Sequence, residues 1–364
     1  LAYSNDNGRT FTKYDKNPIL RSSDRRKDFR DPKVFWYAPG NKWIMIVAAD
    51  KEMRFYSSEN LKEWTYMSGW GEGYGVQPSQ FECPDMVELP VDGNPDHKKW
   101  ALIVNVNPGC YFGGSATQYF VGTFNGKEFV NESPSKTKWM DWGKDHYATV
   151  TWSDAPDNRR IAIAWMSNWQ YANDVPTFQY RSPNSVPRDL SLFTVDGETY
   201  LQSAPSPELL KLRDISKKRS FKVNGTRTIK DMIAGNEGAY EIELTIENQH
   251  ADVIGFRLYN DKGEEVDMQY DMKEKKFSMD RRKSGEVGFN ENFPMLTWTT
   301  IESGKDELKL RLFVDKSSVE AFGDGGRFVM TNQVFPSEPY THIDFYSKGG
   351  AYKVDSFVIY KLKK

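Results

Sequence analysis

Three acidic motifs recur along the first half of the chain, and each is followed by two apolar segments with a polar turn between them. The motifs occupy residues 29–32, 81–85 and 144–148, and their acids Asp31, Glu82 and Asp145 lie 51 and 63 positions apart. Repeats of roughly 40 to 50 residues with four strands each are typical of a β-propeller, whose blades surround a central channel. Because a radial repeat brings equal positions together, we expect the three acids to share one axial pocket.

A second repeat supports the propeller. Residues 4–11 and 57–64 both contain a polar turn followed by an aromatic residue, and they begin 53 positions apart. Residues 1–204 hold roughly three full repeats, whereas a propeller needs about four blades or more to close. We therefore expect a further N-terminal segment of the same protein, absent from this chain, to complete the propeller.

The composition favours an all-β protein. Aromatic residues make up 14% of the chain, and long helical periodicity is nearly absent. The net charge of −2 argues against nucleic acid or an anionic membrane as a partner. No apolar run approaches the roughly 18 residues of a membrane span. The two cysteines and four scattered histidines form no disulfide framework or metal-binding pattern, so we expect no metal and no cofactor.

The chain changes in character near residue 203. We expect a partial propeller over residues 1–204, a linker with a short helix over residues 205–219, and a β-sandwich over residues 220–364. Ser206 and Pro207 suit the N-cap and the first position of the linker helix. Apolar–polar alternation, as in residues 240–246 and 308–314, favours the sandwich. No acidic cluster like the first three occurs there, so we expect a packing or binding role for this domain.

The order of the motifs resembles glycoside hydrolase family 32, which contains invertases, inulinases, levanases and other β-fructosidases. The resemblance rests on Arg-Asp-Pro at 30–32, Glu-Cys-Pro at 82–84, Asp-x-Tyr-Ala at 145–148, and the segments 164–169, 186–190 and 313–323. It implies a five-bladed β-propeller followed by a β-sandwich. It also implies a glycosidase that cleaves β-fructosyl linkages in fructans or fructo-oligosaccharides of levan or inulin type.

The resemblance further implies roles for single residues. A retaining glycosidase uses two carboxyl groups roughly 5 to 5.5 Å apart, one as nucleophile and one as acid/base. Glu82 matches the acid/base, and Asp31 matches the acid that binds fructosyl hydroxyls and stabilises the transition state. Arg30 is able to donate several hydrogen bonds to sugar oxygens. Asp145 and Trp169 match positions that line the fructosyl pocket.

The sequence departs from the family at the nucleophile. The family's nucleophile is an Asp in an N-terminal Asn-Asp-Pro-Asn-Gly-like motif, and residues 1–364 contain no such motif. We expect the missing N-terminal segment to supply it, so that this chain alone lacks double-displacement chemistry. We also expect an extracellular, periplasmic or cell-surface location, with the signal region outside this chain.

Other classes of protein share parts of this pattern. Residues 4–11 resemble the Asp-box turn of sialidases, and arabinan-cleaving propeller enzymes share the layout of three acids. The absence of a nucleophile motif also fits a non-catalytic carbohydrate-binding protein built on a glycosidase scaffold. An Asn-Asp-Pro motif in the upstream sequence would indicate the enzyme.

Overall fold

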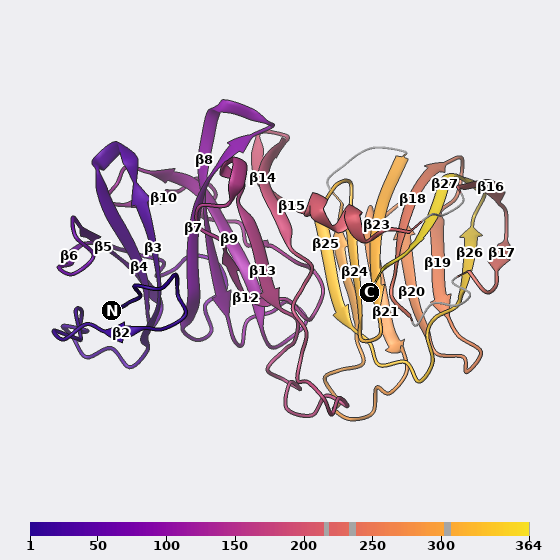
Figure 1. The fold of residues 1–364 in the computed structure, drawn as a ribbon. Helices are drawn as coiled ribbons and strands as arrows, with labels where there is room; N and C mark the ends of the chain where they lie inside the picture. The colour runs from indigo at the N-terminus through magenta and orange to yellow at the C-terminus, as the bar shows by residue number, and fades with distance from the viewer. Residues whose placement is uncertain (215–217, 233–237, 302–306, 364) are drawn as a thin grey trace.

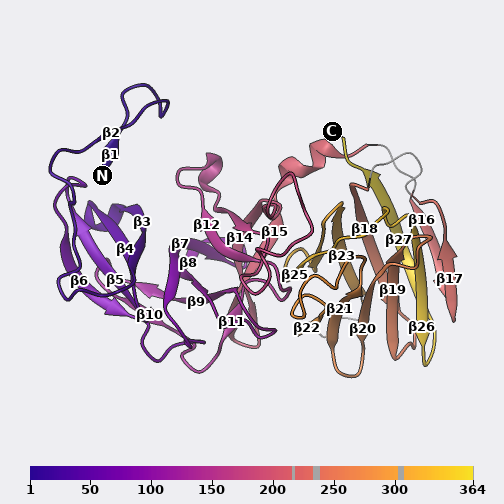
Figure 2. The same cartoon turned by 90° about the horizontal axis from the view of Figure 1, so that it is seen from below.

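The computed structural model describes residues 1–214, 218–232, 238–301 and 307–363. Within these ranges the regular structure is strand apart from three short 3₁₀ helices, none of which has the length to cross a membrane. Figure 1 shows two bodies in succession, β3–β15 and then β16–β27, and the β-propeller followed by a β-sandwich is thereby confirmed. A small hairpin of β1 (Ala2–Tyr3) and β2 (Thr12–Lys13) stands away from the blades (Figure 2).

Three antiparallel meanders form the blades in the part of the chain that the structure describes. The first contains β3 (Phe29–Tyr37), β4 (Lys42–Ala49), β5 (Glu52–Ser58) and β6 (Thr65–Trp70), with η1 (Ala38–Gly40) in its first turn. The second contains β7 (Phe81–Val91), β8 (Asn94–Val106), β9 (Ala116–Phe124) and β10 (Phe129–Asn131), with β11 (Lys138–Trp139) also paired to β9. The third contains β12 (Tyr147–Thr151), β13 (Ile161–Trp165), β14 (Arg188–Val195) and β15 (Glu198–Pro205), with η2 (Pro156–Asn158) after β12. A hairpin therefore follows each acidic motif, as expected.

Apolar strand residues hold neighbouring blades together. β4 is continuously buried from Ile44 onward, because the residues on both of its faces are apolar. Between the first and second blades, four aromatic rings pack with centroids 5.5–6.4 Å apart: Phe35, Phe55, Trp100 and Phe124. Such ring contacts add to the burial energy of the side chains. They join β3 and β5 of the first blade to β8 and β9 of the second.

The polar turns recur more often than the sequence suggested. Asp6, Asn60 and Asn125 each accept backbone N–H groups two to four residues later, at 2.9–3.0 Å. In the first turn these bonds, led by the one from Thr10, lower the pKa of Asp6 to about 2. A side-chain oxygen that replaces a backbone acceptor stabilises a tight turn. The three turns are thus structural, and they connect β1 to β2, β5 to β6 and β9 to β10.

The sandwich consists of two six-stranded antiparallel sheets. One sheet contains β16 (Arg219–Val223), β18 (Tyr240–Asn248), β23 (Glu307–Asp315), β24 (Ser318–Gly323), β25 (Phe328–Gln333) and β27 (Tyr352–Lys361). The other contains β17 (Thr226–Ile229), β19 (Val253–Tyr259), β20 (Glu265–Asp271), β21 (Lys276–Lys283), β22 (Leu296–Thr300) and β26 (His342–Lys348). Their facing apolar residues form the largest buried cluster of the described residues. The alternation seen in the sequence is the source of this core.

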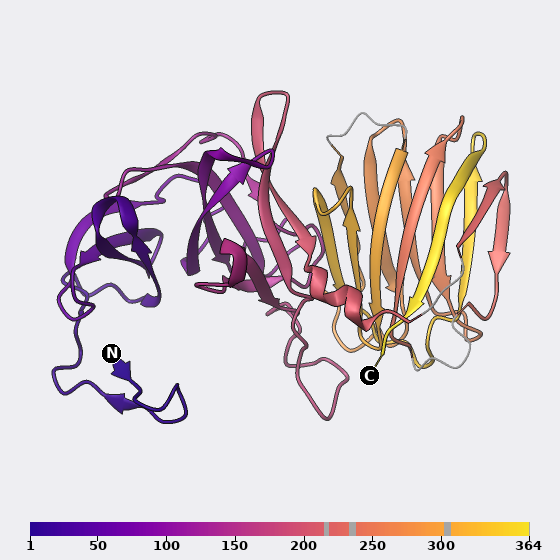
Figure 3. The same cartoon turned by 45° about the horizontal axis from the view of Figure 1, so that its top comes forward.

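The linker differs from the expected capped helix. It forms the 3₁₀ helix η3 (Pro207–Leu212), with Pro207 at its start as expected. Ser206 does not cap it, because the Ser206 hydroxyl donates to Asp189 Oδ1 at 2.5 Å. Residues 215–217 of the expected linker lie outside the described residues. In Figure 3 this helix bridges the third blade and the sandwich.

The sandwich meets the blades along β25. Residues 141–145 run beside this strand and pair with it: Trp142 N–H donates to Val329 O at 2.8 Å, and Asp145 N–H donates to Thr331 O at 3.1 Å. The approach requires a glycine between them, since a Cβ atom on Gly143 would lie 1.9 Å from Thr331 O. The segment therefore lies against the edge strand β25 of the sandwich, held by these two backbone bonds.

Buried charges cross the same interface. Arg188 of β14 donates at 2.9 Å both to Asp141 and to Glu320 of the sandwich, and its side chain is fully buried. Buried ions are tolerated when they are paired and hydrogen-bonded. Burial raises the pKa of Glu320, and the charge of Arg188 opposes that rise. The cluster ties the last blade to the sandwich.

We expect Arg188→Ala to lower the free energy of unfolding by about 3–5 kcal/mol, because two buried carboxylates lose their cation. The control is Arg159→Ala, which removes partly exposed pairs with Asp189 and Glu208 and should cost about 1 kcal/mol or less for each pair. Urea denaturation of both variants measures the difference. Equal losses would contradict a locking role for Arg188.

Candidate active site

The first strand of each blade carries the same backbone irregularity at its head. In β3, β7 and β12 two residues stand opposite a single residue of the adjacent strand, at positions 31–32, 83–84 and 148–149. The leading residues Asp31, Cys83 and Ala148 have positive φ angles of 57°, 43° and 53°. A β-bulge of this kind re-aims nearby side chains and is common beside active sites. The three strand heads therefore form one repeated constellation.

This register corrects the expected alignment of the acids. The residue before each bulge is Arg30, Glu82 and Tyr147, so the equivalents of Glu82 are an arginine and a tyrosine. Asp31 lies one position later than Arg30 and belongs to the bulge itself. Asp145 lies two positions before Tyr147 and precedes its strand. The carboxylates of Asp31, Glu82 and Asp145 therefore do not occupy equal positions.

The three equivalent side chains meet at Glu82. Arg30 Nη2 donates to Glu82 Oε1 at 2.7 Å, and the Tyr147 hydroxyl donates to Glu82 Oε2. The bond to Glu82 is the main reason that the pKa of Arg30 lies above its ordinary value. The side chains of Glu82 and Arg30 remain 16% and 35% exposed. A carboxyl group held by two donors and open on one side is arranged for proton exchange with a bound molecule.

Asp31 lies beside Arg30 and Glu82, and its side chain is 31% exposed. Its Oδ2 atom accepts the N–H of Cys83 at 3.0 Å and lies 3.7 Å from Arg30 Nε. Burial, with the nearby carboxylates of Asp31 and Glu82, raises the pKa of the Cys83 thiol to about 12. The thiol therefore stays neutral beside the acids. The structure brings Arg30, Asp31 and Glu82 together, as the sequence predicted.

A buried polar network lies three or four residues further along these strands. Lys33 Nζ lies 2.9 Å from Asp85 Oδ2 and donates to Thr151 O at 2.7 Å. Thr151 N–H in turn donates to Asp85 Oδ2 at 2.7 Å, and Asp85 is fully buried. The network connects β3, β7 and β12, and the sequence analysis did not identify it. It holds the three strand heads in a common frame beneath the cluster around Glu82.

Asp145 is placed elsewhere, contrary to the expected place on the fructosyl pocket. Its side chain is fully buried, and Arg281 of the sandwich donates to its carboxylate. Tyr171 OH donates to Asp145 Oδ1 at 2.5 Å, and Gln333 N–H donates to Asp145 Oδ2 at 2.8 Å. Both carboxylate oxygens are thus engaged by the protein. This geometry contradicts a pocket-lining role, and it makes Asp145 a contact between the domains.

Trp169 lies at the end of an aromatic row that begins at Tyr147. Its ring centroid lies 4.9 Å from that of Trp165, which lies 6.2 Å from that of Tyr147. Trp169 is 51% exposed, so the free face of its indole is available. Its backbone N–H donates to the Ser115 hydroxyl at 3.0 Å. An exposed aromatic face beside polar groups suits the apolar side of a sugar ring.

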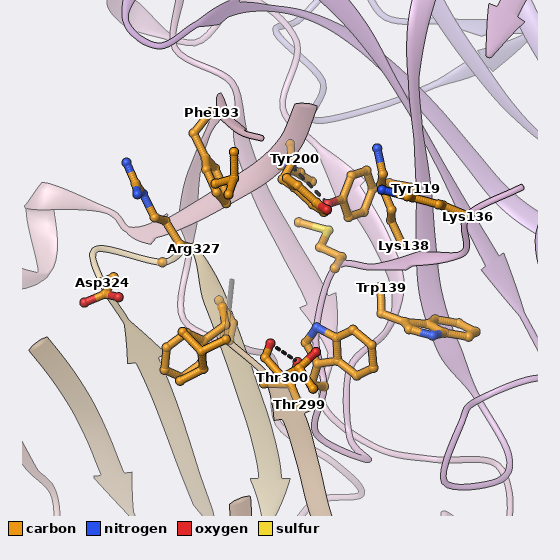
Figure 4. A pocket seen from close by; sticks show the side chains of 18 of the residues that line it. Tyr119, Lys136, Lys138, Trp139, Phe193, Tyr200, Thr299, Thr300, Asp324 and Arg327 are labelled. Atoms are coloured by element: carbon orange, nitrogen blue, oxygen red, sulfur yellow. Dashed lines mark hydrogen bonds between the residues drawn. The ribbon is translucent and has the colours of Figure 1, made fainter. Parts of the chain in front are cut away.

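A separate cavity of about 330 Å³ lies between the blades and the sandwich (Figure 4). Tyr119, Trp139, Phe193 and Tyr200 of the blades face Thr299 of the sandwich across it. Its lining residues do not include Arg30, Asp31, Glu82 or Trp169. The cavity is therefore distinct from the candidate active site.

Comparison with known proteins decides the family. Residues 1–205 match the model of the glycosyl hydrolases family 32 N-terminal domain, and residues 208–361 match that of the family 32 C-terminal domain. The chain belongs to glycoside hydrolase family 32. The resemblance seen in the sequence is confirmed, and the sialidase and arabinan-type alternatives are set aside.

Relatives within family 32 cover the whole of this chain. A levanase of Bacillus subtilis (strain 168) is 43% identical over 100% of this chain and 54% of its own length. An extracellular exo-inulinase of Aspergillus awamori is 33% identical over 100% of this chain and 71% of its own. The crystal structure of exo-inulinase from Aspergillus awamori matches with a TM-score of 0.91 at 31% identity, over 100% and 74% of the two chains. The chain thus spans about half the length of the levanase that it matches.

His146 lies between Asp145 and the active-site residue Tyr147, and it is buried. Burial, reinforced by the charge of Arg188, lowers the pKa of His146 from 6.5 to about 3. Its Nε2 atom has no hydrogen-bond partner among the described residues. The imidazole is therefore neutral in the folded protein. Its contribution to stability is complete above the unfolded pKa and is lost as the pH falls toward 3.

We expect His146→Gln to weaken the dependence of stability on pH between 6.5 and about 4. One such group contributes a slope of up to about 1.4 kcal/mol per pH unit in this window. Melting temperatures of the wild type and the variant, measured at half-unit steps of pH, test this. Parallel curves for the two proteins would show that another group carries the acid sensitivity.

Proposed function

We propose that this chain carries the acid/base and the fructosyl-binding residues of a β-fructosidase that cleaves β-fructosyl linkages in fructans of levan or inulin type, with retention of configuration. The convergence of Arg30, Asp31, Glu82 and Tyr147 on one partly exposed opening carries this proposal. Membership of family 32 and the names of the levanase and exo-inulinase relatives support the substrate class.

Glu82 acts as the acid/base in this proposal. Its carboxyl group donates a proton to the oxygen of the departing sugar, and its carboxylate then removes a proton from the water that attacks the intermediate. The donors Arg30 and Tyr147 suit this exchange, because they hold both oxygens of Glu82 in one orientation while the side chain stays partly exposed. Orientation of this kind is a large part of the efficiency of general acid catalysis.

Arg30 and Asp31 bind the fructosyl unit. The guanidinium offers donors to sugar oxygens, and the Asp31 carboxylate accepts hydroxyl hydrogens and faces the positive charge that develops on the ring. The exposed indole of Trp169 forms an apolar wall for the furanose. Asp145 is left out of this set, because its oxygens are occupied by Arg281, Tyr171 and Gln333.

The nucleophile comes from a segment outside residues 1–364. Retention requires a second carboxylate close to the acid/base. Within these residues the sequence offers no Asn-Asp-Pro motif for it, and Asp31 already accepts the backbone of Cys83. The complete protein acts outside the cytoplasm, in keeping with the extracellular exo-inulinase among the relatives.

We expect Glu82→Gln in the complete protein to lower kcat on levan and inulin by a factor of about 10² or more, because general acid–base catalysis is lost. KM should change little. Initial rates provide the measurement, and NMR of the first product should show the retained anomer. The matched control is Glu88→Gln, on the same strand but 42% exposed, which should leave kcat unchanged. Full activity of Glu82→Gln, or an inverted first product, would contradict the role.

Residues 1–364 alone should not hydrolyse fructans, because the nucleophile is not among them. The test is an assay on levan and inulin of this chain with its mass verified, with and without the preceding segment added as a second polypeptide. Turnover only with the added segment supports the proposal. Robust turnover without it would place the nucleophile within this chain. Fructan binding by the complete protein without turnover would favour the non-catalytic alternative.

A further inference from the structure

We propose that the sandwich domain orients the acid/base, and that Arg281 on β21 is the positioning residue that does so through Asp145 and Tyr147. This inference rests on the proposed function of Glu82. It assigns a role in the reaction to a residue of the second domain, for which the sequence suggested only packing or binding.

The path begins where the sandwich holds residues 141–145. Thr331 N–H donates to Asp141 Oδ1 at 2.8 Å, and Lys144 N–H donates to Asn332 Oδ1 at 3.0 Å. Asp145 N–H donates to Thr331 O at 3.1 Å. Two of these bonds go to side-chain oxygens and one to a backbone oxygen, and together they fix residues 141, 144 and 145 against the strand. The backbone that leads into β12 is therefore placed by β25 of the sandwich.

Arg281 completes the attachment at Asp145. The guanidinium donates to the Asp145 carboxylate, to Tyr171 OH at 2.8 Å and to the backbone oxygens of Phe293 at 2.8 Å and Gln333 at 3.1 Å. Its charge centre lies 3.9 Å from the centroid of the Phe293 ring. Arg281 and Asp145 are both fully buried. Such a fork fixes the direction of the carboxylate as well as its position.

A single residue, His146, separates this anchor from Tyr147, which contacts the acid/base. Tyr147 follows Asp145 after the buried His146, and its hydroxyl donates to Glu82 Oε2. The next residue, Ala148, has φ of 53°, so the chain turns through the bulge immediately after Tyr147. With the bulge on one side and Asp145 on the other, little backbone freedom remains to Tyr147. The geometry of its bond to Glu82 thus depends on the sandwich.

A purely stabilising role does not require this arrangement. A buried ion pair is often no better for stability than apolar residues of the same volume. The pair does however fix orientation, and a catalytic group needs to be held within about 0.5 Å of its productive position. The ion pair between Arg281 and Asp145 lies at the interface of the two domains, two positions before Tyr147, which donates to Glu82. A positioning role requires a contact so close to Tyr147.

The test compares Arg281→Met with Arg213→Met in the complete protein. Arg213 is the matched control, because its guanidinium also binds a fully buried carboxylate, Glu241, at 2.9 Å and lies 4.0 Å from the ring of Tyr360. Each variant is assayed on inulin, whose sugar leaving group needs a proton, and on 4-nitrophenyl β-fructofuranoside, whose leaving group needs little assistance. The ratio of the two kcat values reports acid catalysis and is insensitive to the fraction of folded enzyme.

Arg281→Met should lower kcat on inulin about tenfold more than on the aryl substrate, a fraction of the 10² to 10⁴ that a general acid contributes. Tyr147→Phe should change the ratio in the same direction, and Arg281→Lys by less. Arg213→Met should keep the ratio of the wild type even where it lowers the melting temperature. An unchanged ratio for Arg281→Met or, where that variant does not fold, for Arg281→Lys would overturn the proposal.

A second measurement needs no turnover. Hydrogen exchange of peptides that cover residues 144–151 should be faster in Arg281→Met than in the wild type, and unchanged in Arg213→Met. Unchanged exchange in Arg281→Met would overturn the inference. Failure of the proposed function has a different signature, since the wild type would then be inactive on both substrates or Glu82→Gln would be fully active.

Discussion

The β-bulge repeated at the heads of β3, β7 and β12 determines where Arg30, Glu82 and Tyr147 point. Side chains alternate along a strand, so a shift of one position would turn them to the opposite face. The bulge inserts one residue at the same place in each blade and brings Arg30, Glu82 and Tyr147 to one point. Positive φ at Asp31 and its equivalents costs about 1–3 kcal/mol each. The aromatic contact between the blades and the network around Asp85 offset that strain.

The two arginine–carboxylate contacts Arg30–Glu82 and Arg281–Asp145 use the same pair of chemical groups but differ in burial. Arg30 and Glu82 share an opening, and 35% and 16% of their side-chain surfaces remain accessible to a ligand. The side chains of Arg281 and Asp145 have no accessible surface. An accessible pair is able to exchange a proton or bind a sugar, whereas a fully buried pair is able only to hold two elements in a fixed relation. An arginine–carboxylate pair is thus accessible to a ligand at Glu82 and serves as a buried contact between domains at Asp145.

The sequence was sufficient for what depends on local pattern. Hairpins follow each acidic motif, alternation produced the sandwich, and motif order led to family 32. The register was not recovered, because the acids were aligned by charge. Pro32 and Pro84 were the available signal, since aligning them places Arg30 opposite Glu82. The partner of Asp145 lies 136 positions away on another domain, and no local pattern points to such a contact.

Residues 141–147 form a direct connection between the sandwich and the cluster around Glu82. This segment belongs to the third blade by sequence, pairs with β25 of the sandwich through its backbone, and ends at the donor to Glu82. Gly143 is needed for that pairing, because any Cβ atom would meet the Thr331 backbone. A displacement of the sandwich would therefore act on the backbone that leads into Tyr147. The sandwich thereby holds the segment that ends at the donor to Glu82, although none of its described residues bonds to Glu82 itself.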